Sequence, residues 1–111
     1  MTRLESTFER DTIAEIKRQL PGCIVLKNDS GLRQGIPDRI VLYYDKWAAL
    51  EFKRSWVEAQ EQHLRPNQGY YVHTMNNMSF AAFIYPENKD EVLDGLLRAL
   101  QPRRQARVSR R

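Results

Sequence analysis

The stretch RIVLYYDKWAALEFK, residues 39–53, decides the expected fold of this 111-residue chain. Two runs rich in β-branched, aliphatic and aromatic residues, 39–44 and 47–53, flank the polar pair Asp45 and Lys46. Such runs on either side of a short polar link are typical of an antiparallel hairpin. The sequence therefore predicts a β-hairpin at the centre of the chain.

Charged residues are expected on one side of this hairpin. With the turn centred between Asp45 and Lys46, the numbers of facing residues add up to 91, so Asp38 faces Lys53. Side chains two apart on a strand share a face, and so do directly opposed side chains. Asp38, Glu51 and Lys53 are therefore expected to converge on one patch of the sheet. A register shift by an odd number of residues would separate them.

This predicted patch has apolar neighbours on both faces, including Ile40 and Leu50. Placing two carboxylates and a lysine there costs on the order of several kcal/mol unless they are paired or bind a cation. A divalent metal relieves the repulsion between close carboxylates, and magnesium prefers one or two carboxylates together with water and phosphate oxygens. The triad thus predicts a site for Mg²⁺, or for Mn²⁺ in its place.

The remaining pattern predicts helices and strands on either side of the hairpin. Apolar residues at helical spacing indicate an amphipathic helix over 6–20, with Ser6 as its N-cap. The other expected elements are a strand at 23–27, a loop at 28–38, a helix at 66–76, a strand at 79–85 and a helix from 86 to about 100. The order α-β-β-β-α-β-α predicts an α/β fold, a mixed sheet flanked by helices.

The composition fits one intracellular domain. A chain of 111 residues with 41% hydrophobic content is long enough for one core and too short for two. No apolar run approaches the roughly 18 residues of a membrane span, and the charged first residues do not fit a secretory signal. The single cysteine, Cys23, excludes a disulfide framework and a cysteine-based zinc site. We therefore expect a cytoplasmic protein with no membrane partner.

The positive charge is concentrated at the C-terminus. Residues 103–111, RRQARVSRR, hold five arginines and no acid, and subtracting them from the net charge of +4 leaves −1 for the rest. We expect a domain at 1–101 and a basic arm at 102–111. Arg103 and Arg104 in this arm would neutralise nucleic-acid phosphates. A solubilising tail explains the same charge equally well.

The motifs resemble those of a known superfamily. GIPD at 35–38, a hydrophobic hairpin and EFK at 51–53 are similar to the PD-(D/E)XK nucleases, and most to VRR-NUC domains and phage junction-resolving endonucleases. The likeness extends from residue 9 to about residue 100. It implies a restriction-endonuclease-like fold and a magnesium-dependent endonuclease that hydrolyses DNA phosphodiester bonds.

The resemblance also implies roles for individual residues. Asp38 and Glu51 would bind the metal together with the backbone carbonyl of Phe52, and Lys53 would be the catalytic lysine. Related proteins carry a glutamine on the helix after the catalytic strand, which corresponds to Gln68. A plain surface glutamine is the alternative for that residue.

The superfamily's acid on the first helix has three candidates here, Glu5, Glu9 and Glu15. Glu9 shares a helix face with the apolar residues of the predicted helix and is expected to point inward as a further metal ligand. Two alternatives remain open. Ser6 and Glu9 have the spacing of a capping box, and Glu15 would otherwise be the active-site acid.

Several basic residues lie in or beside the predicted loops around the site. Arg33 and Arg54 are the strongest candidates for contacts with DNA phosphates, followed by Lys27, Arg39 and Arg65. The likeness to phage resolvases favours branched DNA, a junction or a flap, and symmetric junction cleavage requires two active sites and hence a homodimer. The alternatives are a sequence-independent nickase or restriction-type nuclease, a non-catalytic DNA-binding module, and RNA as the substrate.

Overall fold

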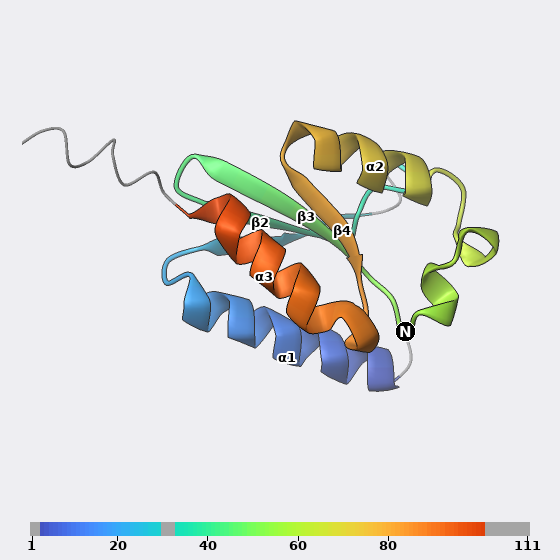
Figure 1. Cartoon of the computed structure of the whole chain (residues 1–111), viewed down its shortest axis with the longest axis horizontal. Helices are drawn as coiled ribbons and strands as arrows, with labels where there is room; N and C mark the ends of the chain where they lie inside the picture. The colour runs from blue at the N-terminus through green and yellow to red at the C-terminus, as the bar shows by residue number, and fades with distance from the viewer. Residues whose placement is uncertain (1–2, 30–32, 102–111) are drawn as a thin grey trace, which may run out of the picture.

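Three helices and four strands form a mixed α/β fold in the computed structural model, which describes residues 3–29 and 33–101 (Figure 1). The predicted α/β class and the predicted order of elements are both present. The elements are α1 (Arg3–Gln19), β1 (Ile24–Lys27), β2 (Arg39–Tyr43), β3 (Lys46–Phe52), α2 (Gln68–Met78), β4 (Phe80–Ile84) and α3 (Lys89–Leu100). Every predicted helix and strand thus has its counterpart, with ends that differ by a few residues.

The four strands make one sheet in the order β1-β2-β3-β4. Strands β1, β2 and β3 are antiparallel neighbours, whereas β3 and β4 are parallel. A parallel pair needs a crossover connection, and α2 supplies it. Helices α1 and α3 lie side by side on one face of the sheet, and α2 lies on the other (Figure 1).

The hairpin exists, but its predicted register was wrong by two residues. Tyr43 pairs with Lys46, so the turn consists of Tyr44 and Asp45 and the numbers of paired residues add up to 89 instead of 91. Tyr44 adopts a left-handed backbone with φ 56°, which a tight two-residue hairpin turn requires at its first position. Because the shift is even, each side chain stays on its predicted face.

Helix α1 begins earlier than predicted. It starts at Arg3, so Ser6 lies within the helix and the expected Ser6 N-cap and capping box with Glu9 are wrong. The helix ends before Pro21 and Gly22, as predicted, and Gly22 has φ 90°, a conformation that glycine adopts without strain. One consequence is that Glu9 belongs to the second turn of the helix and is available for a tertiary contact.

Each face of the sheet has its own apolar cluster. The larger cluster joins Ile16 of α1, Leu20 just after that helix and Leu96 of α3 to Leu50 and Phe52 of β3. The smaller cluster lies under α2 and is centred on three buried residues, Ala49, Val72 and Ala81. Because alanine side chains are short, α2 packs close to β3 and β4. This close packing brings the first residue of α2 to the end of β3.

The segment between β3 and α2, expected to be polar and irregular, contains two short 3₁₀ turns, Val57–Ala59 and Glu61–His63. Among the helices that the structure describes, none is both long and apolar enough to cross a membrane. The predicted basic arm at 102–111 lies outside the described residues, so its separation from the domain stays a prediction.

Helix α1 carries one buried polar atom that lowers stability. Thr12 is fully buried, and its Oγ1 has no hydrogen-bond partner among the described residues. We expect Thr12→Val, which keeps the side-chain shape and removes the hydroxyl, to raise the free energy of unfolding by about 1 kcal/mol. Urea denaturation measures the change. Thr12→Ser, which keeps the hydroxyl and loses a methyl group, should lower it instead. Equal effects of the two substitutions would contradict this account.

Candidate metal and phosphodiester site

Two carboxylates meet where β2 begins and β3 ends. The backbone N–H of Asp38, the residue before β2, donates to Oε1 of Glu51 over 3.1 Å. In return, the backbone N–H of Phe52 donates to Oδ2 of Asp38 over 3.3 Å. These crossed bonds continue the β2–β3 pairing with side-chain acceptors, because the observed register makes Asp38 and Glu51 the next facing pair. The predicted convergence of the two acids is therefore present.

Lys53 and Gln68 complete the group. The Lys53 ammonium donates to Oε1 of Gln68 over 2.9 Å, and the amide of Gln68 donates to Oε2 of Glu51 over 2.8 Å. The Lys53 Nζ lies 3.8 Å from the same Glu51 oxygen. Gln68 is the first residue of α2 and is buried, so it is not a plain surface glutamine. One amide thus holds both the acid and the lysine in place.

Burial and mutual repulsion make the two acids hard to ionise. Removal from water, followed by the negative charge of Asp38, raises the pKa of Glu51 to about 8. Removal from water also raises the pKa of Asp38, and the nearby Glu9 carboxylate adds to this rise. Lys53 offsets part of the repulsion, and the charges of Arg39 and Arg65 lower the pKa of Asp38 and of Glu51 respectively. Burial outweighs these cations, so both pKa values stay raised. Among the described residues, Lys53 is the one cation within 4.0 Å of the two acids.

This donor set matches a hard divalent cation. Asp38 and Glu51 offer carboxylate oxygens from adjacent strands, and Mg²⁺ is held in proteins by one or two carboxylates together with water and phosphate oxygens. Within residues 3–29 and 33–101, no three His, Cys, Asp or Glu side chains come together as a larger ligand group. The carboxylate oxygens of Asp38 and Glu51 fit magnesium better than zinc, which prefers nitrogen and sulfur donors.

Glu9 points inward, as predicted from its helix face, but it binds an arginine. Its side chain is buried, and its Oε2 accepts a hydrogen bond of 2.6 Å from Nε of Arg39. Glu9 is close enough to raise the pKa of Asp38, yet its carboxylate already forms an ion pair with Arg39. Glu15 instead pairs with Lys89 of α3 at 3.0 Å, which places it away from the site. The side chain of Glu5 lies outside the described part of the chain.

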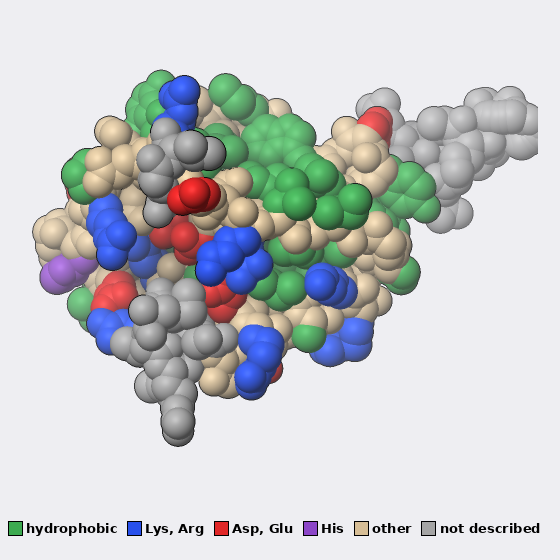
Figure 2. All heavy atoms as spheres, turned by 180° about the vertical axis from the view of Figure 1, so that it is seen from behind, with side chains coloured by type: hydrophobic (Ala, Val, Ile, Leu, Met, Phe, Trp, Pro, Cys, Tyr) green, Lys and Arg blue, Asp and Glu red, His purple; other side chains and the backbone are tan. Residues whose placement is uncertain are grey.

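The predicted phosphate-binding residues are dispersed around this group. Arg33 donates to the Tyr71 hydroxyl over 3.1 Å, and Arg54 forms an ion pair with Glu58. The charge of Arg65, whose side chain is exposed, lowers the pKa of Glu51, whereas Lys27 is exposed on β1. Arg103 and Arg104 lie outside the described residues. Figure 2 shows acidic side chains near the centre of this face, with lysine and arginine side chains around them.

Asn28 and Asn67 support the site and were not singled out from the sequence. The Asn28 side chain donates to the Pro37 carbonyl over 2.7 Å, and its backbone N–H donates to the Asp38 carbonyl over 2.8 Å. Asn67 has φ 71° at the start of α2 and lies against Gly35. An asparagine in a loop has many possible partners, so no sequence pattern pointed to these contacts.

The contact between Gly35 and Asn67 fixes the Asp38 loop against α2. Gly35 has φ 96°, and a Cβ at this position would lie 2.7 Å from the carbonyl carbon of Asn67. Real side chains do not approach a backbone this closely. Because Asn67 precedes Gln68, this contact aligns the loop that carries Asp38 with the amide that holds Glu51. A glycine is therefore required at position 35 for two reasons, its backbone conformation and the close approach.

Gly35→Ala should cost more stability than the backbone strain alone. Gly22 is the matched control, since it has a similar φ of 90° but no atom lies within 4 Å of the place a Cβ would occupy. We expect Gly22→Ala to lower the free energy of unfolding by about 1 kcal/mol and Gly35→Ala by about 2 kcal/mol or more. Urea denaturation of both variants measures the difference. Equal losses of unfolding free energy would show that the contact with Asn67 does not require a glycine at position 35.

The raised pKa of Glu51 predicts a pH-dependent stability. Between pH 4.5 and about 8 the unfolded chain ionises this acid while the folded protein keeps it protonated, so stability falls as the pH rises. In the presence of EDTA, we expect wild type to lose on the order of a few kcal/mol more than Glu51→Gln between pH 5 and pH 8. Urea denaturation at a series of pH values tests this. Parallel pH profiles for the two proteins would refute it.

Comparison of the chain with protein-family models, with curated proteins and with solved structures finds no match. The description of the site therefore depends on its own geometry: two facing carboxylates, one lysine and one shared amide, at the junction of β2, β3 and α2.

Proposed function

We propose that this protein is a metal-dependent endonuclease that hydrolyses DNA phosphodiester bonds. The observation that carries the proposal is the pair of half-buried Asp38 and buried Glu51, joined by crossed hydrogen bonds and accompanied by Lys53. A structural ion pair would match each acid with a base in contact, whereas among the described residues Lys53 alone lies within 4.0 Å of the pair. A divalent cation and a phosphate together would satisfy this group.

The arrangement of the elements supports the proposal. A mixed sheet with an α-β-β-β-α-β-α order, and acidic residues at the start of β2 and the end of β3, is compatible with the restriction-endonuclease-like core that the GIPD and EFK motifs led us to expect. Because one fold hosts many activities, the fold gives only weak support for nuclease activity. The chemistry of the site gives stronger support.

The residues of the chain divide the work between binding and positioning. Asp38 and Glu51 would hold Mg²⁺ or Mn²⁺, with the Phe52 carbonyl as a further oxygen donor on the same strand. When bound, the cation supplies the missing positive charge and polarises a phosphate oxygen. Lys53 neutralises negative charge that builds up on the phosphate as water attacks phosphorus and the P–O bond breaks. Gln68 positions Lys53 and Glu51 through its one amide.

We infer a branched DNA substrate, a junction or a flap, from the likeness to phage resolvases. A domain of this size has no separate sequence-reading element such as a zinc finger, which favours recognition of DNA shape. Cleavage of a junction on both sides requires two active sites, and a homodimer would supply them. A nickase or restriction-type nuclease would use the same chemistry on unbranched DNA. Cleavage of linear or nicked duplex in the test below would identify it.

The test is a cleavage panel of junction, flap, nicked and linear duplex DNA, with an RNA strand of matching sequence. We expect cleavage in Mg²⁺ or Mn²⁺ and none in EDTA. Asp38→Asn and Lys53→Ala should each lower the rate by orders of magnitude, because each removes a group required at the reacting phosphate. Lys46→Ala is the matched control, a lysine at the other end of β3. Cleavage that survives both site substitutions would refute the assignment.

Metal binding separates the enzyme from a DNA-binding module of the same fold. A cation that binds the folded protein raises its melting temperature. We expect millimolar Mg²⁺ or Mn²⁺ to raise the Tm of wild type and to have little effect on Asp38→Asn. An unchanged Tm in wild type, together with tight DNA binding and no cleavage, would identify a non-catalytic module.

A further inference from the structure

An open groove of about 470 Å³ runs between α1 and the edge of the sheet that β1 and β2 form. It lies on the α1 face of the sheet, whereas Asp38, Glu51 and Lys53 belong to the face that α2 covers. Two apolar residues of α1, Ile13 and Ala14, also line it. Cationic side chains from three different elements line its walls.

The charge of this groove is strongly one-sided. Four cationic residues and a single carboxylate, Glu9, line it, which gives a net charge of +3; the cations are Arg10, Lys17, Lys27 and Arg39. Within the described part of the chain, neither Lys17 nor Lys27 has a carboxylate within 4.0 Å. A domain with a net charge of −1 (residues 1–101) thus gathers positive charge in one concave surface, where Lys17 and Lys27 are uncompensated. Such a surface attracts a polyanion.

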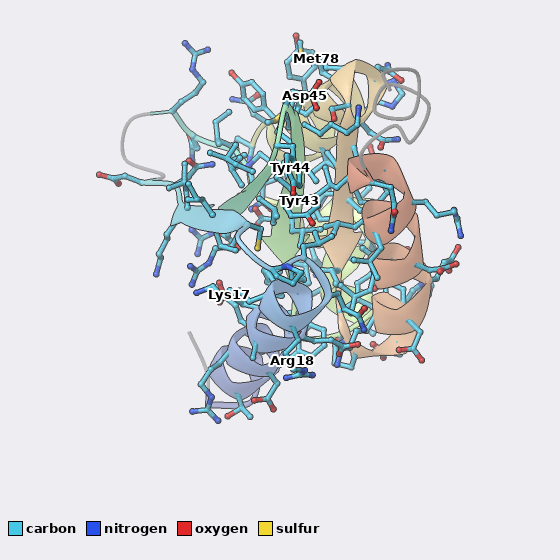
Figure 3. All side chains as sticks on the ribbon, turned by 90° about the vertical axis from the view of Figure 1, so that its left-hand side faces the viewer. Lys17, Arg18, Tyr43, Tyr44, Asp45 and Met78 are labelled. Carbon is cyan, nitrogen blue, oxygen red and sulfur yellow. The ribbon has the colours of Figure 1, made fainter. Side chains whose placement is uncertain are left out.

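The two unpaired lysines come from opposite walls. Lys27 ends β1, and Lys17 lies in the last turn of α1. Figure 3 shows the side chain of Lys17 directed toward the side of α1 where β1 lies, while the neighbouring Arg18 points elsewhere. Charges on both sides of the groove, together with the apolar residues that line it, suit an elongated chain of phosphates and sugars better than one compact anion.

The groove adjoins the proposed active site. Two of its lining residues, Glu9 and Arg39, form the ion pair that lies next to Asp38, and Arg39 directly follows Asp38 in the chain. Figure 2 likewise shows lysine and arginine side chains beside the central acidic group. A strand whose phosphate reaches Asp38 and Glu51 can therefore continue over Arg39 into this groove.

We propose that this groove binds the phosphodiester backbone of one DNA strand and leads it to the Asp38–Glu51 site. That the strand leads toward Asp38 and Glu51 rests on the proposed function. Binding of DNA in the groove can be tested without cleavage. Lys17 and Lys27 contact successive phosphates, and Arg39 is the link between the groove and the reacting phosphate.

The experiment measures binding of a fluorescein-labelled single-stranded DNA 20-mer by anisotropy, in EDTA so that no cleavage occurs. The variants are Lys17→Glu, Lys27→Glu and their double substitution, with Arg18→Glu as the matched control one residue away on α1. We expect Kd to rise about tenfold or more in the double variant and less than twofold in the control. The slope of log Kd against log salt concentration should fall by about 0.7 for each lost phosphate contact.

The outcomes separate this inference from the proposed function. An unchanged Kd in the double variant, or an equal loss in the Arg18→Glu control, overturns the groove even where wild type cleaves DNA. A selective loss of binding supports the groove even where no DNA is cleaved, in which case the proposed function alone fails. All three substituted residues are exposed, so each variant is expected to fold. Circular dichroism of each variant checks this.

Discussion

Two hydrogen bonds between the start of β2 and the end of β3 are the constraint on which the site depends. Each uses a backbone N–H of one strand and a carboxylate of the other, so Asp38 and Glu51 take the places that two more backbone carbonyls would occupy in a longer ladder. The acids are thereby held by the sheet itself. Their spacing follows from strand geometry, which is far stiffer than a loop.

Holding two acids in this way has a cost. Burial raises the pKa of both, and Lys53 and Gln68 offset only part of their repulsion. A structure selected for stability alone would replace this group with apolar residues, because buried charges are seldom stabilising. We propose that a bound cation supplies the missing positive charge.

The two faces of β2 divide two tasks. Asp38 belongs to the face that α2 covers, where Gln68 joins the acid and the lysine. Arg39, the next residue, points to the α1 face, where it binds Glu9 at the edge of the basic groove. Alternation along one strand thus connects the proposed cation site to the proposed surface for phosphates. The Gly35–Asn67 contact keeps the loop before β2 in line with α2.

The sequence by itself determined the order of the helices and strands, the α/β class and the face on which Asp38, Glu51 and Lys53 lie. These features follow from local periodicity, and side-chain alternation survived a register error of two residues because two is an even number. Tertiary structure alone decided the pairing of Glu9 with Arg39 and of Glu15 with Lys89, the shared amide of Gln68, and the contact that requires Gly35. Each of these joins residues far apart in the chain, and their distances depend on how the helices pack on the sheet. Periodicity along the chain carries no information about those distances.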